Sequence, residues 1–286
     1  MTPRIGILGG SGLYDMAGLA GREERVVETP FGAPSDAYVL GEIAGVPVAF
    51  HARHGRGHRI SPSEIPFRAN VFGFKTLGCD AILSASAVGS LREELAPSHV
   101  CVPDQFIDRT RSRSDTFFRD GIVAHVSLAD PVCPAISAVL AGSARAAGAV
   151  VHEGGVYVCM EGPPFSTRAE SNLYRSWGAS VIGMTNLTEA KLAREAEICY
   201  ATMALVTDYD CWREATEAVS VDAVLAVLRG NAETAQRALL DAVARIDPAR
   251  GCGCRDALRY AIVTDPARIP ARVRADLAPL LGRRLP

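Results

Sequence analysis

Short apolar runs that alternate with helical patterns constrain the fold of this chain more than any other feature of the sequence. Apolar runs of strand length occupy residues 4–8, 81–86, 99–107, 150–160, 181–185 and 198–207. Apolar residues at helical spacing occupy residues 63–77, 134–147, 166–177, 189–196 and 220–246. Residues 37–43 and 46–52 read as a hairpin around Ala44-Gly45. Strands that alternate with helices and include one hairpin predict an α/β domain with a mixed central sheet.

The 286 residues fit one large α/β unit with a sizeable core. We assign residues 1–246 to the main domain. Residues 247–286 form a C-terminal extension that is rich in Pro and Arg yet carries enough apolar side chains to pack. We expect this extension to pack on the same domain or on a neighbouring subunit.

Charge and hydropathy exclude two classes of partner. The chain has 30 basic and 32 acidic residues, so its formal charge of −2 predicts no general attraction to nucleic acid. The basic run at residues 109–113 is interrupted by small polar residues and reads as a solvated loop. Apolar stretches fall short of the roughly 20 residues that a membrane helix needs, and the first residues lack the pattern of a secretory leader. We therefore expect a cytoplasmic protein without membrane contact.

Eight cysteines are scattered along the chain, and six of them lie in or beside apolar runs, where a reduced thiol acts as a small hydrophobe. The exception is Cys252-Gly253-Cys254, whose spacing suits a small strained disulfide or a redox pair. A zinc site is less favoured, because no second Cys or His pair follows at ligand spacing. Free thiols are the expected state in a cytoplasm.

A glycine-rich turn follows the first apolar run. Its backbone N–H groups and the hydroxyl of Ser11 can cradle a phosphate. The turn lacks the Lys-Ser/Thr pair of a P-loop, and Asp15 stands where a dinucleotide-binding motif has its third glycine. A dinucleotide-dependent oxidoreductase is therefore a disfavoured alternative, and a plain strand-to-helix turn remains open for this segment.

Polar side chains follow three further apolar runs at the points where those runs end. Arg53 and His54 follow the hairpin, and Ser86 and Thr185 end two other strands. A guanidinium grips two phosphate oxygens at once, and the neighbouring imidazole adds a donor. In open α/β sheets, ligands bind outside the carboxyl ends of the strands, so these side chains and Ser11 are expected to converge. Taken singly, each is equally well explained as an ordinary turn or surface residue.

Two carboxylates end the last apolar run, at Asp208 and Asp210. If the strand stays extended, alternation places both on one side. Like charges that close raise the pKa of one partner, which suits a general acid. The alternative is that both face solvent or help the start of the following helix.

Eight segments together resemble the trimeric purine nucleoside phosphorylase family, and within it the 5′-methylthioadenosine phosphorylases. They are IGILGGSGL, TPFGAPSD, ARHGRGH, VGSLREE, VPDQFIDRT, EGPPFSTRAES, GMT and CYATMALVTDYDCW. The resemblance runs in order from residue 4 to about residue 245. It implies an α/β single domain whose mixed central sheet is partly barrel-like and flanked by helices.

The resemblance also implies a role for each matching residue. The phosphate-binding positions are Ser11, Arg53, His54, Ser86, Ala87 and Thr185. The substrate-binding positions are Phe165 against the purine, Met184 against the ribose, Asp208 and Asp210 on the base, and Val221, Val224 and Leu225 around the 5′ group. Apolar residues at helical spacing equally well form core. His125 matches a position that the adjacent subunit contributes, which implies a homotrimer and leaves its pairing into a hexamer open.

The implied reaction is the phosphorolysis of 5′-methylthioadenosine to adenine and 5-methylthioribose 1-phosphate, with inorganic phosphate as co-substrate and no metal or organic cofactor. Asp208, protonated, is the expected catalytic acid. The alternative is a purine nucleoside phosphorylase that acts on inosine, guanosine or methylthioinosine. Three positions depart from the family pattern. Gly183 replaces a polar residue of some members, Thr188 replaces the usual Pro before Glu189, and Ser11 stands where many members have Thr, which keeps the hydroxyl.

Overall fold

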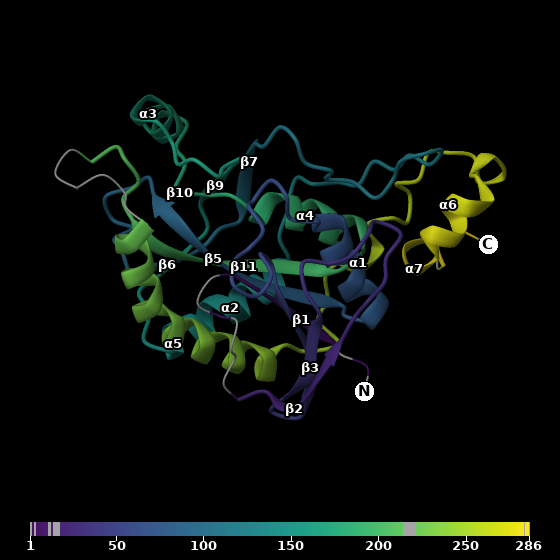
Figure 1. Cartoon of the computed structure of the whole chain (residues 1–286), viewed down its shortest axis with the longest axis horizontal. Coiled ribbons are helices and arrows are strands. Elements are labelled where there is room, and N and C mark those ends of the chain that lie inside the picture. The colour runs from purple at the N-terminus through teal and green to yellow at the C-terminus, as the bar shows by residue number, and fades with distance from the viewer. Residues whose placement is uncertain are drawn as a thin grey trace.

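A branched central sheet with helices on both faces forms the body of the molecule (Figure 1). The computed structural model describes residues 2, 4–10, 13, 18–213, 221–282, 284 and 285. Within helix α5 the side chains of residues 221–226, 228 and 229 are outside this description. The mixed α/β fold that the sequence predicts is confirmed.

The sheet of the described residues contains parallel and antiparallel pairs. Its strands are β1 (Ile5–Gly9), β2 (Ala20–Arg25), β3 (Tyr38–Ile43), β4 (Val46–Ala52), β5 (Ala81–Ser90), β6 (Val100–Val102), β7 (Gln105–Arg109), β8 (Val151–Glu153), β9 (Val156–Met160), β10 (Val181–Gly183) and β11 (Cys199–Asp208). Their main path runs β2-β3-β4-β1-β5-β10-β9-β7. A second arm leaves β5 through β11 and continues to β6 and β8.

Strand β5 is the branch point of the sheet. Its first half pairs in parallel with β1, and its last residues pair antiparallel with β10. Along nearly its whole length it also pairs in parallel with β11. The parallel strands β1, β4, β5 and β11 therefore all run toward one edge of the sheet, and β5 and β11 continue beyond the ends of β1 and β4.

The helices bury both faces of the sheet. They are α1 (Phe67–Leu77), α2 (Pro134–Ala146), α3 (Arg168–Ser176), α4 (Asn186–Glu195), α5 (Val221–Arg245), α6 (Ala271–Asp276) and α7 (Ala278–Leu281), with short 3₁₀ turns at Gly253–Asp256 and Pro266–Arg268. Side chains alternate across each strand, so in β1 Ile5 and Ile7 join the apolar cluster with α2 and α5, whereas Leu8 joins the cluster with α1 and α4. Both faces are thus covered, which is why these strands read as continuous apolar runs.

Local chemistry explains where the elements differ from the sequence-based boundaries. The hairpin of β3 and β4 is confirmed, and its turn residues Ala44 and Gly45 have φ of 50° and 74°. The run at 150–160 is divided by Gly154 and Gly155, so β8 pairs with β6 while β9 pairs with β7 and β10. Helix α3 is capped by Thr167 in a capping box, so it begins at Arg168, two residues after the expected start at residue 166. Strand β2 has no sequence-based counterpart, since its side chains are largely exposed.

The C-terminal extension packs on the main domain of its own chain. Leu258, Leu277 and Leu280 are buried in the same cluster as the side chains of α1. An ion pair between Glu197 and Arg284, with N–O distance 2.6 Å, ties its last turn to the segment before β11. Figure 1 draws α6 and α7 at the opposite end of the molecule from α3.

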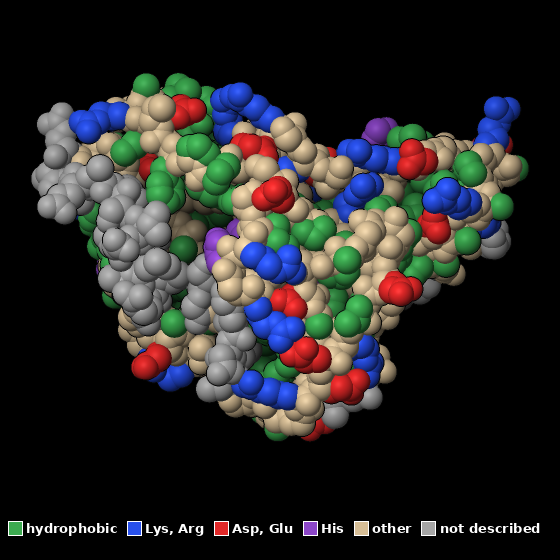
Figure 2. Space-filling view, viewed as in Figure 1, with side chains coloured by type: hydrophobic (Ala, Val, Ile, Leu, Met, Phe, Trp, Pro, Cys, Tyr) green, Lys and Arg blue, Asp and Glu red, His purple; other side chains and the backbone are tan. Residues whose placement is uncertain are grey.

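The surface carries both signs of charge. Lys and Arg side chains are interspersed with Asp and Glu on the face that Figure 2 shows, so this face presents no field of a single sign. Among the described residues, none of the helices combines the length and the apolar character that crossing a membrane requires.

Candidate active site

The common edge of the parallel strands gathers most of the predicted site. Gly9 ends β1 and is in register with Ala52 at the end of β4. The backbone N–H of Arg53 donates to the carbonyl of Gly9 at 3.0 Å, which holds the two strand ends together. Strand β5 lies next to β1, and its Ser86 is in register with Ala204 of β11. Ser11 lies outside the described residues.

Arg53 is the charge buried at the centre of this edge. Its side chain is 1% exposed and forms an ion pair with Glu189, also 1% exposed, through Nε. Its Nη2 donates to Ser84 Oγ at 2.7 Å and to Glu189 Oε2 at 3.3 Å. Burial opposes both charges, but their mutual attraction outweighs it, so the pKa of Arg53 is raised and the pKa of Glu189 is lowered. Both groups are therefore ionised, and the pair as a whole has almost no net charge.

One face of the Arg53 guanidinium remains next to the glycine turn. Nη1 donates to the carbonyl of Ala85 at 3.1 Å, which uses one of its two N–H groups. A Cβ added to Gly10 would lie 2.9 Å from the same Nη1. Glycine at this position therefore leaves room between the turn and the guanidinium.

A buried hydrogen-bond network extends the ion pair to Ser86. The carboxylate of Glu189 accepts from the hydroxyls of Tyr200 at 2.7 Å and Ser84 at 2.9 Å. The amide of Asn186 donates to Ser84 Oγ and Tyr200 Oη, and its Oδ1 accepts from Ser86 Oγ at 2.6 Å. Sequence reasoning missed Ser84, Asn186 and Tyr200. The signal for them was polar side chains inside apolar runs, which require buried partners.

Helix α4 adds its amino end to the same edge. Thr185 is its N-cap residue and is 4% exposed, yet its hydroxyl makes no capping bond. The first N–H groups of a helix carry partial positive charge and suit an anion. Glu189 lies inside this helix, so Thr188 in place of Pro continues regular helix before it.

His54 has a defined protonation pattern. Its Nδ1 lies 2.8 Å from the carbonyl of Ile60, and because a carbonyl only accepts, Nδ1 carries the proton. Burial and the charge of Arg53 lower the pKa of His54 to about 4. The imidazole is therefore neutral at pH 7, and its Nε2 is a hydrogen-bond acceptor, whereas the sequence suggests a donor. His58 stacks on it with ring centroids 4.1 Å apart.

The two carboxyl groups after β11 come together, but not by strand alternation. The strand ends at Asp208, and Asp210 has φ of 52°, in the left-handed region. The turn brings the backbone N–H of Asp210 to within 2.7 Å of Asp208 Oδ1. Both side chains lie over Gly89 of β5, where an added Cβ would be 3.1 Å from Asp208 Oδ1 and 3.3 Å from the Cβ of Asp210. The two side chains therefore lie on the same side of the sheet, as expected, but a turn places them there and not an extended strand.

Burial raises the pKa of Asp208, and the hydrogen bonds from Thr207 Oγ1 and the Asp210 N–H only partly oppose it. Burial and the nearby Asp208 also raise the pKa of Asp210. Asp210 is 6% exposed, and its Oδ2 has no hydrogen-bond partner among the described residues. A buried acceptor without a partner is costly, which marks this carboxyl as one that a ligand can satisfy.

The loop between β9 and α3 packs against Met184, which directly follows β10. A Cβ added to Gly162 would lie 2.6 Å from Met184 Sδ, so glycine permits this contact. Arg113 holds the two segments together, because its guanidinium donates to the carbonyls of Met184 and Glu161. Its side chain is 1% exposed, so the solvated loop expected at 109–113 is wrong for this residue. Phe165 projects from the same loop and is 47% exposed.

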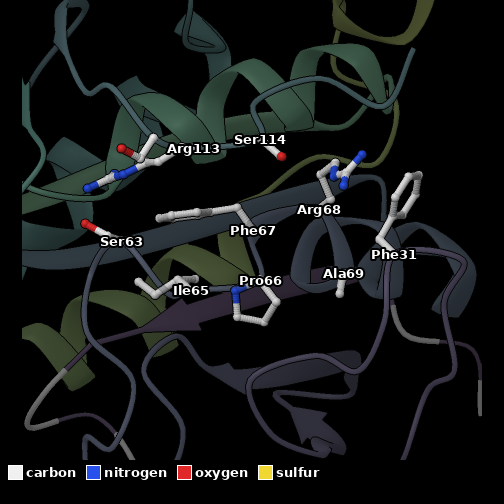
Figure 3. Close-up of a pocket in the computed structure, with 10 residues that line it drawn as sticks. Phe31, Ser63, Ile65, Pro66, Phe67, Arg68, Ala69, Arg113 and Ser114 are labelled. Atoms are coloured by element: carbon white, nitrogen blue, oxygen red, sulfur yellow. The ribbon is translucent and has the colours of Figure 1, made fainter. Parts of the chain in front are cut away.

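Figure 3 shows residues that line a pocket, one of which, Ser63, contacts this loop through Glu161. The pocket has a volume of about 220 Å³ and lies at the amino end of α1. Its lining includes Ser63, Phe67 and Arg113, and Ser63 Oγ donates to the carboxylate of Glu161 at 2.7 Å. The sequence-predicted site residues do not line it. The chemistry is therefore assigned to the strand edge, and the pocket borders the Arg113 side of that edge.

Gly183 departs from the family pattern for a steric reason. A Cβ there would lie 1.9 Å from Tyr157 Oη and 2.6 Å from its Cζ. Tyr157 is fully buried against Val88 and Val181, so its ring has no room to move away. The tyrosine thus takes the space of a side chain at position 183.

We expect Gly183→Ala to lower the free energy of unfolding by about 1–3 kcal/mol, the usual cost of overpacking a filled core. Gly230→Ala in α5 is the matched control, because an added Cβ there meets open space. That helical substitution is expected to be neutral or to stabilise by about 0.5–1 kcal/mol. Chemical denaturation of both variants measures the difference, and equal midpoints would contradict the steric assignment.

The structure does not place the two remaining groups of predicted residues at this edge: His125 lies elsewhere on the chain, and the side chains of the other group are not described. His125 is exposed, and its backbone N–H donates to the carbonyl of Ala261 in the C-terminal extension at 2.8 Å. That extension is drawn in Figure 1 at the end opposite α3. Val221, Val224 and Leu225 lie in the first turns of α5, and their side chains are outside the described part of the chain.

The comparisons with known proteins agree with this architecture. The profile of the phosphorylase superfamily matches residues 4–244, so the chain belongs to that superfamily. It is 59% identical to S-methyl-5′-thioadenosine phosphorylase of Geobacter sulfurreducens over 99% of both chains. A solved methylthioadenosine phosphorylase from an antarctic soil metagenomic library has 50% identity and a TM-score of 0.94, covering 98% of this chain and 100% of that one. The enzyme of Schistosoma mansoni in complex with adenine has 36% identity and a TM-score of 0.83, covering 99% of both chains.

Proposed function

We propose that this chain cleaves 5′-methylthioadenosine with inorganic phosphate to give adenine and 5-methylthio-α-D-ribose 1-phosphate. Relatives that match it from end to end are named for this reaction. The observation that carries the proposal is the buried carboxyl of Asp208 at the end of β11. Burial raises its pKa, and the parallel strands that lead to Arg53 and Ser86 run toward the same edge of the sheet. An acid and an anion site on one edge are what phosphorolysis of a nucleoside requires.

Phosphate would bind at the carboxyl ends of β1, β4 and β5. Its partners in the proposal are Ser11, Arg53, His54, Ser86, Ala87 and Thr185. Because Glu189 already balances Arg53, much of the attraction must come from N–H groups of the glycine turn and of the α4 end. His54, neutral with an accepting Nε2, would bind the one protonated oxygen of a hydrogen phosphate dianion.

The reaction follows from where charge develops. As the bond from C1′ to N9 breaks, its electron pair moves to the purine, and the ribose becomes oxocarbenium-like. The phosphate beneath C1′ stabilises that cation and then forms the new C–O bond. Asp208 donates its proton to N7, which neutralises the leaving purine. Phosphate is a co-substrate here, and we propose that the chemistry needs no metal or organic cofactor.

The base is recognised by its pattern of donors. The 6-amino group of adenine donates, so it needs an acceptor, and the partnerless Oδ2 of Asp210 offers one. A 6-oxo purine would instead require a donor at that point. Phe165 would stack on the base, and Met184 would lie against the ribose. The known complex of the Schistosoma mansoni enzyme contains adenine, in keeping with this choice.

The 5′ group and the oligomer complete the proposal. Val221, Val224 and Leu225 would form an apolar pocket that suits a methylthio group better than a hydroxyl. His125 would reach the site of a neighbouring copy, which makes a homotrimer the functional unit. We further propose that the enzyme works in the cytoplasm, where it returns adenine and the methylthioribose unit of methionine metabolism to use.

The proposal predicts adenine release from 5′-methylthioadenosine that depends on phosphate. Release is measured with and without phosphate, and inosine is compared at the same phosphate concentration. We expect no release without phosphate and a larger kcat/KM for methylthioadenosine than for inosine. A preference for inosine would favour a purine nucleoside phosphorylase for 6-oxo purines, and release without phosphate would indicate a hydrolase.

A further inference from the structure

Four of the eight cysteines meet at the end of the sheet away from the proposed active site. Cys133 precedes α2, Cys199 is the first residue of β11, and Cys252 and Cys254 belong to the C-terminal extension. Their four sulfurs all lie within 4.8 Å of one another, and the sulfurs of Cys199 and Cys252 are 3.3 Å apart. Three of the four residues are buried, and Cys252 is half-buried. The spacing along the chain does not predict this cluster, because Cys133 and Cys199 come from segments distant from the C-x-C pair and from each other.

The cluster differs from the remaining buried cysteines. Cys79 and Cys101 lie singly in the core, and burial holds the pKa of their thiols well above the usual value. Such thiols behave as small hydrophobes. Four sulfurs converging from three segments instead form a complete set of soft ligands.

We propose that Cys133, Cys199, Cys252 and Cys254 bind one zinc ion as a structural tetrathiolate site. Zinc prefers four sulfurs in a tetrahedron at about 2.3 Å, which places neighbouring sulfurs about 3.8 Å apart. Mutual distances of at most 4.8 Å match a single ion at the centre of the four. The larger span of an iron–sulfur cluster would need sulfurs farther apart.

Positive charge lies beside the cluster, as a site of net negative charge needs. Cys133 is the N-cap residue of α2, so it lies at the positive end of that helix. The positive charge of Arg250 lies near enough to Cys199 to interact with it electrostatically. Arg250 is itself fixed by Asp80, with 2.9 Å between Nη2 and Oδ1. Such outer contacts orient ligands and balance the two negative charges of a zinc tetrathiolate.

The site would fasten the C-terminal extension to the base of the sheet. Cys199 and Asp208 are the two ends of β11, a strand of 10 residues, so the cluster lies about 30 Å from the proposed acid. The ion therefore takes no part in the reaction. Its role is to hold the extension, which carries Leu258 into the core and Ala261 against His125. A closed site with four protein ligands is typical of structural zinc.

The test measures metal in the full-length protein purified under reducing conditions without chelator. We expect one zinc per chain by elemental analysis, and a Co²⁺-substituted protein with the intense visible bands of tetrahedral cobalt thiolate. Cys252→Ser is the variant of choice because Cys252 is the half-buried ligand, and Cys101→Ser is the matched control. Zinc affinity should fall by at least about tenfold in the first and stay unchanged in the second.

Further measurements keep the proposal open to refutation if Cys252→Ser fails to fold. Zinc should raise the Tm of the metal-free wild type, and a chelator should reverse that rise. Four thiols should become reactive when the metal is removed. A reduced wild type that binds neither zinc nor cobalt would overturn the zinc assignment. A purified chain whose mass is below that of the reduced chain by two or four hydrogens, with the disulfides located among these four cysteines, would also overturn it.

Discussion

Glu189→Gln is expected to lower the free energy of unfolding by about 3–5 kcal/mol and to abolish most phosphorolysis. The substitution leaves the guanidinium of Arg53 charged at a position where its side chain is 1% exposed. Removing one partner of a buried pair costs this much because the remaining charge is uncompensated. The amide also loses one of the two oxygens that receive Arg53, Ser84 and Tyr200. Chemical denaturation and turnover of methylthioadenosine measure the two effects.

An exposed ion pair provides the matched control for this variant. Glu153 pairs with Arg145 at 2.5 Å, and both side chains are 51% exposed. Glu153→Gln should change the free energy of unfolding by less than about 1 kcal/mol and leave turnover intact. If Glu189→Gln and Glu153→Gln lower the free energy of unfolding equally, the buried Arg53–Glu189 pair does not stabilise the fold more than an exposed pair does.

A double variant separates stability from function. Arg53→Met with Glu189→Leu replaces the pair by apolar side chains of similar size, which often recovers stability. We expect this protein to regain part of the lost free energy but no activity, because the phosphate site lacks its guanidinium. Recovered activity would mean that Arg53 serves only the fold.

The sequence predicts most of the architecture because periodicity reports burial. The runs that became β1, β5 and β11 are apolar on both faces, and both faces are covered by helices. Strand β2 escaped this reasoning because its side chains are exposed, so only its backbone pairing with β3 makes it a strand. Pairing between distant segments is not visible in local periodicity.

The candidate site is predictable only as far as each strand end can be located. Ser86, Arg53 and Thr185 were found because they follow apolar runs. The network through Asn186 and Tyr200 was missed, because hydrogen bonds between residues on three elements depend on three-dimensional packing. The approach of Asp210 to Asp208 depends on a left-handed residue, which alternation along a strand does not predict.

The cysteines show the same limit more sharply. The C-x-C pair was recognised, but Cys133 and Cys199 looked like core residues because each stands in an apolar run. Both are indeed buried, and their sulfurs nevertheless face the pair. Ligand spacing identifies a metal site only when the ligands are close in sequence.

Asp208→Asn is expected to lower kcat for methylthioadenosine by about 10²–10⁴-fold, the range for loss of a general acid. An amide can still donate a hydrogen bond to N7, but it has no proton to transfer. Because Asp210 still offers an acceptor to the 6-amino group, the variant should keep its preference for methylthioadenosine over inosine. Turnover of both nucleosides measures the effect, and Asp130→Asn, at an exposed position, is the control.

The pH profile distinguishes an acid from a residue that merely positions the base. Burial raises the pKa of Asp208, so its protonated fraction is larger at every pH than that of an ordinary aspartate. If only the protonated form donates, kcat of the wild type falls as pH rises through that pKa. The amide that Asp208→Asn introduces does not titrate, so the variant should lack this alkaline limb while remaining slow. A variant that keeps both the limb and the wild-type rate would show that the proton comes from another group. The carboxyl of Asp210, whose Oδ2 has no hydrogen-bond partner among the described residues, would then be the next candidate.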